Sequence, residues 1–114
     1  MNKDDLRKRT KKFALDTIKF VESLPKGKTA EIIGRQLLRS GTSVGANYRA
    51  ACRARSSADF IAKMGIVEEE LDESIYWMEL LVDSGIVTRL PSAPIALSPR
   101  TPWDGEISRP DDRG

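Results

Sequence analysis

The sequence predicts an all-α protein, an up-and-down antiparallel helical bundle of three long helices followed by an irregular tail. Three observations support this prediction. Apolar and small residues recur at steps of three and four along three segments, proline, glycine or serine separates these segments, and five of the six prolines fall after residue 88. With 39% hydrophobic and 32% charged residues, the 114-residue chain fits one domain and leaves no room for a second full one.

The first predicted helix spans about residues 4–24. Asp4 and Asp5 lie in its first turn, where carboxylates suit the positive end of the helix dipole. Pro25 and Gly27 end it, because proline cannot continue the hydrogen-bond ladder and glycine tolerates the turn. The predicted core positions are Leu6, Phe13, Ala14, Thr17, Ile18, Val21 and Leu24.

The second predicted helix runs from about residue 29 to residue 55. The run from Ser40 to Ser43 would ordinarily suggest a loop, since glycine costs about 1 kcal/mol inside a helix. A loop has no reason to preserve the helical register, so we predict one continuous helix in which Gly41 and Gly45 admit a neighbouring helix closely. The predicted core positions are Ala30, Ile33, Leu37, Gly41, Val44, Tyr48 and Ala51.

The third predicted helix begins after Ser56, an N-cap residue with Asp59 three positions later in the manner of a capping box. Gly85 is a plausible C-cap, which gives about 27 residues, or roughly 40 Å. The predicted core positions are Phe60, Met64, Val67, Leu71, Ile75, Met78 and Val82.

Two regions follow from this pattern: a helical bundle domain at residues 1–88 and a proline-rich tail at residues 89–114, expected to be extended or disordered. No apolar run approaches the ~20 residues that cross a bilayer, and the N-terminus carries no signal-peptide stretch, so we expect a cytoplasmic protein without a membrane partner.

Histidine is absent and cysteine occurs once, at Cys52. The commonest general base and metal ligand is therefore missing, and helix-borne carboxylate metal sites usually pair glutamate with histidine. We expect no catalytic residue, no metal, no cofactor and no small-molecule substrate.

The net charge of +2 hides a strong segregation, because residues 1–63 carry +9, residues 64–88 carry −7 and the tail is neutral. On the second helix four arginines form one line pointing away from the predicted core: Arg35, Arg39, Arg49 and Arg53. We call them the arginine stripe. Guanidinium groups suit phosphate, which makes the stripe a candidate nucleic-acid surface that Lys8, Lys11, Lys12 and Lys19 would widen. An ordinary solvated face and a protein or subunit partner remain alternatives.

The third helix carries a second apolar line opposite its core face, which predicts an oligomer interface. Its members are Ile66, Trp77 and Leu80, with Glu70 and Glu73 placed to meet arginines across the contact. Trp77 fits an intrachain core equally well.

Residues 36–51, QLLRSGTSVGANYRAA, and residues 57–63, SADFIAK, are similar to the 23S ribosomal RNA intervening-sequence proteins, and the similarity covers about residues 7–88. The resemblance implies a cytoplasmic up-and-down bundle with no established enzymatic activity. Relatives assemble as homopentamers, and the similar accessory protein of diversity-generating retroelements binds nucleic acid and a reverse transcriptase. Family members continue with a fourth amphipathic helix, which the proline-rich residues after 88 lack.

Together these features predict a non-enzymatic accessory protein that binds RNA or DNA as an oligomer, a pentamer by resemblance. The alternative is a structural self-assembly or protein-interaction scaffold with no nucleic-acid role.

Overall fold

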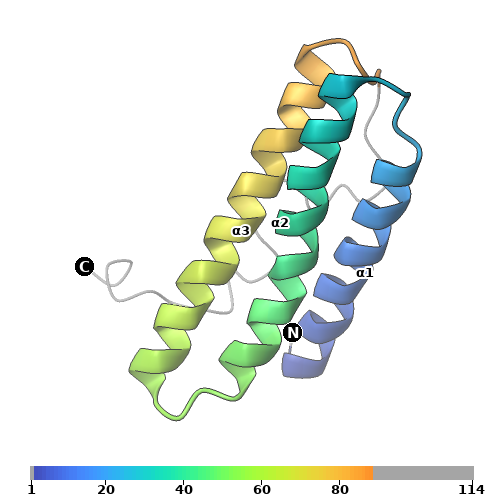
Figure 1. The fold of residues 1–114 in the computed structure, drawn as a ribbon. Coiled ribbons are helices and arrows are strands. Elements are labelled where there is room, and N and C mark those ends of the chain that lie inside the picture. Colours follow the sequence, from blue (N-terminus) through green and yellow to red (C-terminus); the bar gives the residue numbers. More distant parts are fainter. Residues whose placement is uncertain (1, 89–114) are drawn as a thin grey trace.

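The computed structural model describes residues 2–88, which form three helices and no strand (Figure 1). The helices run up, down and up, with α2 between α1 and α3 and packed against both. The predicted all-α architecture is confirmed. The predicted tail at residues 89–114 lies outside the described residues. None of the helices described is long and apolar enough to cross a membrane.

Helix α1, Lys3–Glu22, begins at a capping box that the sequence reading missed. The Asn2 side chain accepts a hydrogen bond from the Asp5 backbone N–H at 2.9 Å, and the Asp5 carboxylate accepts one from the Asn2 N–H at 3.3 Å. These bonds satisfy two donors that would otherwise lack partners at the helix start. Gly27, with φ of 156°, precedes the next helix.

Helix α2, Lys28–Cys52, is continuous through Gly41, as predicted. The polar run does not break it because its hydroxyls donate to carbonyls of the preceding turn. Ser40 donates to the Leu37 carbonyl at 3.2 Å, Thr42 to Leu38 at 2.7 Å and Ser43 to Arg39 at 2.7 Å. The side chains therefore do not compete for the donors of the helix ladder.

Helices α1 and α2 approach closely where α2 carries glycine. A Cβ on Gly41 would stand 2.7 Å from Thr17 Cγ2, and one on Gly45 would stand 3.3 Å from Thr10 Oγ1. The expectation that these two glycines admit a neighbouring helix is confirmed, and α1 is that neighbour.

Helix α3, Ser57–Asp83, has the 27 residues predicted for it. The Ser56 hydroxyl accepts the Asp59 backbone N–H at 3.1 Å, which confirms the N-cap. The Asp59 carboxylate lies 2.6 Å from Lys63 Nζ, and this hydrogen bond lowers the pKa of Asp59. Gly85, just beyond the helix, has a φ of 82°, which favours glycine.

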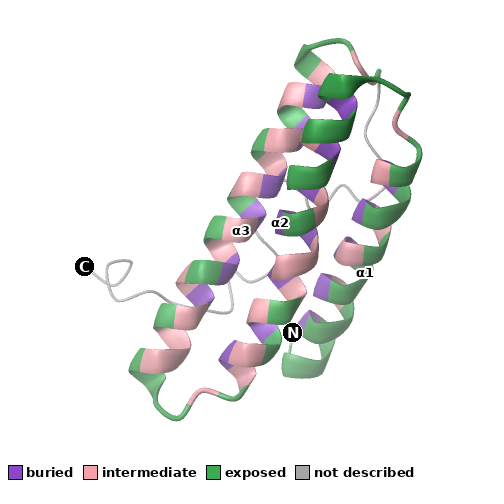
Figure 2. Cartoon of the chain, viewed as in Figure 1, coloured by how far each residue is buried: buried purple, intermediate pink, exposed green. Residues whose placement is uncertain are grey.

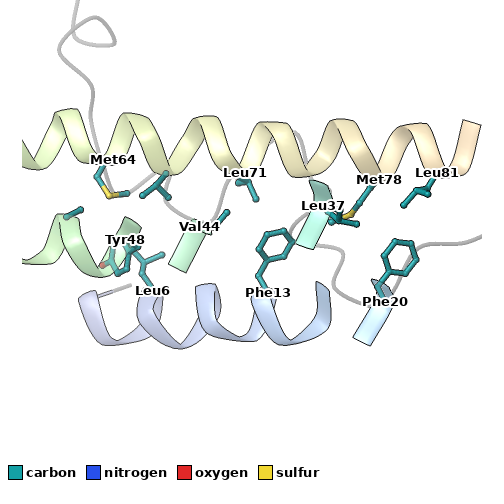
Figure 3. Close-up of a cluster of buried hydrophobic side chains, with 12 residues drawn as sticks. Leu6, Phe13, Phe20, Leu37, Val44, Tyr48, Met64, Leu71, Met78 and Leu81 are labelled. Carbon is teal, nitrogen blue, oxygen red and sulfur yellow. The ribbon is translucent and has the colours of Figure 1, made fainter. Parts of the chain in front are cut away.

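One hydrophobic core lies between the three helices (Figures 2 and 3). Ile18, a predicted core residue, is 40% exposed, whereas Phe20 is buried at 7%. The reason is geometric: Phe20 lies within about 20° of the buried Phe13 around the helix axis, and Ile18 lies about 140° away. The core also encloses a polar pair that the sequence did not reveal, in which Ser74 of α3 donates to Ser40 Oγ of α2 at 2.8 Å.

Candidate nucleic-acid interface on α1 and α2

All four members of the arginine stripe are exposed; three of them lie in α2, and Arg53 is the residue that follows it. Their ion pairs divide them. Arg35 pairs with Glu31 one turn away at 2.7 Å, and Arg39 pairs with glutamates of α3. Arg49 and Arg53 have no acidic partner among residues 2–88. The four arginines therefore differ in their electrostatic surroundings: Arg35 and Arg39 face carboxylates, whereas Arg49 and Arg53 do not within the described part of the chain.

Arg39 binds two carboxylates of α3 within the same chain. Its Nη1 lies 3.5 Å from Glu70 Oε1, and its Nη2 contacts Glu73 Oε2. Trp77 Nε1 also donates to Glu73 Oε2, at 3.2 Å. Hydrogen bonds from Trp77 and Arg39 lower the pKa of Glu73, and the contact with Glu73 raises the pKa of Arg39. The predicted meeting of Glu70 and Glu73 with an arginine therefore occurs inside one chain.

A basic groove lies where α1 faces the second half of α2, with a volume of about 380 Å³. Arg7 and Lys11 of α1 and Arg49 of α2 supply its charge, and none of its lining residues is acidic. Arg7 lies 3.9 Å from Asp4, and no acidic group among residues 2–88 pairs with Lys11. We refer to this cavity as the basic groove.

Hydroxyl groups of Thr10 and Thr42 also line the basic groove. Both donate to the backbone, Thr10 to the Arg7 carbonyl at 3.1 Å and Thr42 to the Leu38 carbonyl at 2.7 Å. Thr10 is only 4% exposed, so the half-buried Thr42 is the residue whose Oγ1 lone pairs remain for a hydrogen bond from a ligand. The sequence analysis named Lys11 and Arg49 as candidates but not Arg7. The spacing of four residues between Arg7 and Lys11, which puts both on one side of α1, could have indicated it.

A second cavity, the apolar pocket, lies at the other end of the junction between α1 and α2 and has a volume of about 500 Å³. Its apolar walls come from the end of α1, the loop after it and the first half of α2, namely Val21, Leu24, Pro25, Ala30 and Leu38. Three charged residues also line it: Lys26 and the ion pair of Arg35 with Glu31.

The residues of the predicted oligomer interface all lie on α3. Ile66 is 45% exposed, while Trp77 and Leu80 are half-buried. Trp77 packs against the core, and its ring centroid lies 5.2 Å from that of Tyr76, which is 53% exposed. Of the three apolar members of the predicted interface only Ile66 is therefore exposed, and Tyr76 is a further exposed apolar residue of α3. Among the residues described, no group of histidine, cysteine, aspartate or glutamate side chains is arranged to hold a metal ion.

Comparison with known proteins matches the chain to a protein family and to solved structures. The family model described as 23S rRNA-intervening sequence protein matches residues 2–94. A crystal structure of a protein with unknown function from the S23 ribosomal protein family of Bacteroides thetaiotaomicron VPI-5482 is 38% identical, with a TM-score of 0.67 over 73% of this chain and 77% of that one. Neither description names an enzymatic activity. No curated protein matches the chain.

Proposed function

The chain belongs to the 23S rRNA-intervening sequence protein family, and we propose that it is a non-enzymatic accessory protein that binds nucleic acid and acts as a cytoplasmic oligomer. The basic groove carries this proposal. It brings three cations from two helices to one cavity whose lining holds no carboxylate. Phosphate binding needs this arrangement, because a neighbouring carboxylate would compete for the same donors.

The arginine stripe contributes unequally to the proposed surface. Arg49 lines the basic groove, whereas Arg53 is an exposed residue just beyond the end of α2. Arg39 contributes less, because phosphate would have to displace Glu70 and Glu73 from its guanidinium. We expect binding that depends on phosphate contacts and falls steeply with salt.

The test compares Arg49→Ala with Lys8→Ala in the full chain. Both residues are exposed cations on helices, and alanine maintains helix propensity, but Lys8 does not line the basic groove. Fluorescence anisotropy with a labelled structured RNA is measured over a series of salt concentrations. Arg49→Ala should lower affinity and reduce the salt slope by about 1, with a smaller effect for Lys8→Ala. Equal effects of the two variants, or no binding at low salt, would refute the proposal.

A self-assembly scaffold is the second candidate, favoured by the exposed Ile66 and Tyr76 on α3. Here the interface would comprise Ile66, Glu70, Glu73, Trp77 and Leu80, and the expected assembly is a homopentamer. Light scattering distinguishes the roles: Ile66→Asp should reduce the mass of the particle, while Leu15→Asp, at an equally exposed apolar residue of α1, should not. An unchanged mass in Ile66→Asp contradicts this interface.

A further inference from the structure

We propose that the junction of α1 and α2 binds single-stranded RNA, with backbone phosphates in the basic groove and one unstacked base in the apolar pocket. This inference rests on the proposed function and names the class of nucleic acid that the site takes. Its basis is that two cavities of different chemistry lie along the same helix junction.

The two cavities are suitably spaced for one ligand. Gly34 lines the apolar pocket and Gly45 lines the basic groove, and both belong to α2. Eleven residues separate them, which corresponds to about 17 Å along the helix. A short extended strand therefore reaches from one cavity to the other without leaving the junction.

The apolar pocket has the chemistry of a base-binding site. Leu24, Pro25 and Leu38 offer apolar contacts, and the volume exceeds that of a nucleobase. Arg35 adds a planar guanidinium, which pairs with Glu31 at 2.7 Å. Bases stack on arginine planes as well as on aromatic rings.

A duplex cannot use both cavities. Its bases are paired and stacked inside, so a duplex that placed phosphates in the basic groove would present backbone, not a base, to the apolar pocket. A single strand can turn one base outward at little cost. The combination of a phosphate groove and an apolar pocket therefore favours single strands.

The hydroxyls of the basic groove favour ribose. Thr42 Oγ1 already donates its hydrogen to the helix backbone, so it has lone pairs but no proton to offer. A phosphate oxygen also has only lone pairs and gains nothing from it, whereas a ribose 2′-OH donates to it. Deoxyribose lacks this donor.

The experiment measures anisotropy of labelled oligonucleotides of about 12 nucleotides, in the range of single-strand sites on other proteins. Three probes of one sequence are compared on the full-length protein: single-stranded RNA, single-stranded DNA and duplex RNA. We expect single-stranded RNA to bind about tenfold more tightly than duplex RNA, which is the effect of one stacked base, and more tightly than DNA.

Two variants with matched controls test the mechanism. Leu38→Glu, which replaces an apolar wall of the pocket by a second carboxylate besides Glu31, should abolish the preference over duplex, while Leu15→Glu on the outside of α1 should preserve it. Arg35→Ala should do the same as Leu38→Glu, and since Arg35 is exposed its loss does not disturb the core. Thr42→Ala should remove the preference for RNA over DNA.

The outcomes separate the inference from the proposed function. Equal binding of single strand and duplex, both weakened by Arg49→Ala, refutes the inference and leaves the proposed function standing. Equal binding of RNA and DNA refutes the choice of RNA. Failure of every probe to bind at low salt refutes both proposals.

Discussion

The close packing of α1 on α2 gives a sharp prediction from two glycines in comparable helical settings. Gly65 in α3 has no atom within 4 Å of an added Cβ, whereas a Cβ on Gly41 would lie 2.7 Å from Thr17 Cγ2 and 2.9 Å from Thr17 Oγ1. Alanine gains about 1 kcal/mol over glycine in a helix interior. Gly65→Ala should therefore stabilise the protein by about that amount.

At position 41 the same gain is opposed by overpacking, which costs roughly 1–3 kcal/mol. Thr17 cannot move aside, because it is 1% exposed and its hydroxyl donates to the Phe13 carbonyl at 2.8 Å. Gly41→Ala should consequently be about 2 kcal/mol less stable than Gly65→Ala. The assay is urea unfolding followed by circular dichroism at one protein concentration, so that self-association affects all variants alike.

A double-mutant cycle identifies the cause. Thr17→Ala removes the two atoms nearest to an added Cβ and leaves only the Thr17 Cβ, at 3.1 Å, so Gly41→Ala should cost less in that background than in the native one. If Gly41→Ala is as stable as Gly65→Ala, or if Thr17→Ala leaves its cost unchanged, the reasoning from close helix approach is wrong.

Three further predictions concern α3. The pKa of Glu73 is lowered in the folded protein, so the stabilising contribution of its carboxylate is present above the ordinary pKa of 4.5 and is lost as the pH falls below that value. In urea unfolding, Glu73→Gln should therefore lose less stability on acidification than the native protein does. Ser74→Ala should cost about 1 kcal/mol in the same assay at neutral pH, since it leaves buried Ser40 without that donor. Ser56→Ala should cost about 1 kcal/mol through the lost N-cap, seen as a lower urea midpoint.

The helices of this protein were predictable because a single periodic face defines each one. In α2 and α3 the predicted core residues are buried or half-buried, and even the polar run around Gly41 preserved its phase. The error in α1, the assignment of Ile18 to the core, arose because apolar residues occupy more than one face of this helix. Ile18 and Phe20 are both apolar, and only the position of the neighbouring helices decides which of them is buried.

The candidate site was less predictable because its properties depend on pairs far apart in the sequence. The helical spacing predicted that Arg39 points away from the core, and Arg39 is exposed. The partners of Arg39, Glu70 and Glu73, lie more than 30 positions away in the sequence. Likewise, nothing local to Arg7 indicates that it shares a groove with Arg49. Periodicity places a side chain on one side of a helix, whereas its neighbours depend on how the helices pack.

Charge segregation explains why salt experiments need two measurements. Helix α2 lies between α1 and α3 (Figure 1), and the exposed carboxylates Glu69, Asp72 and Glu79 of α3 do not line the basic groove. If these carboxylates meet cations of another copy in an assembly, salt weakens that contact as it weakens phosphate binding. Loss of RNA at high salt supports the basic groove only when light scattering in the same buffer shows an unchanged particle mass. A parallel loss of mass attributes the effect to the subunit contact.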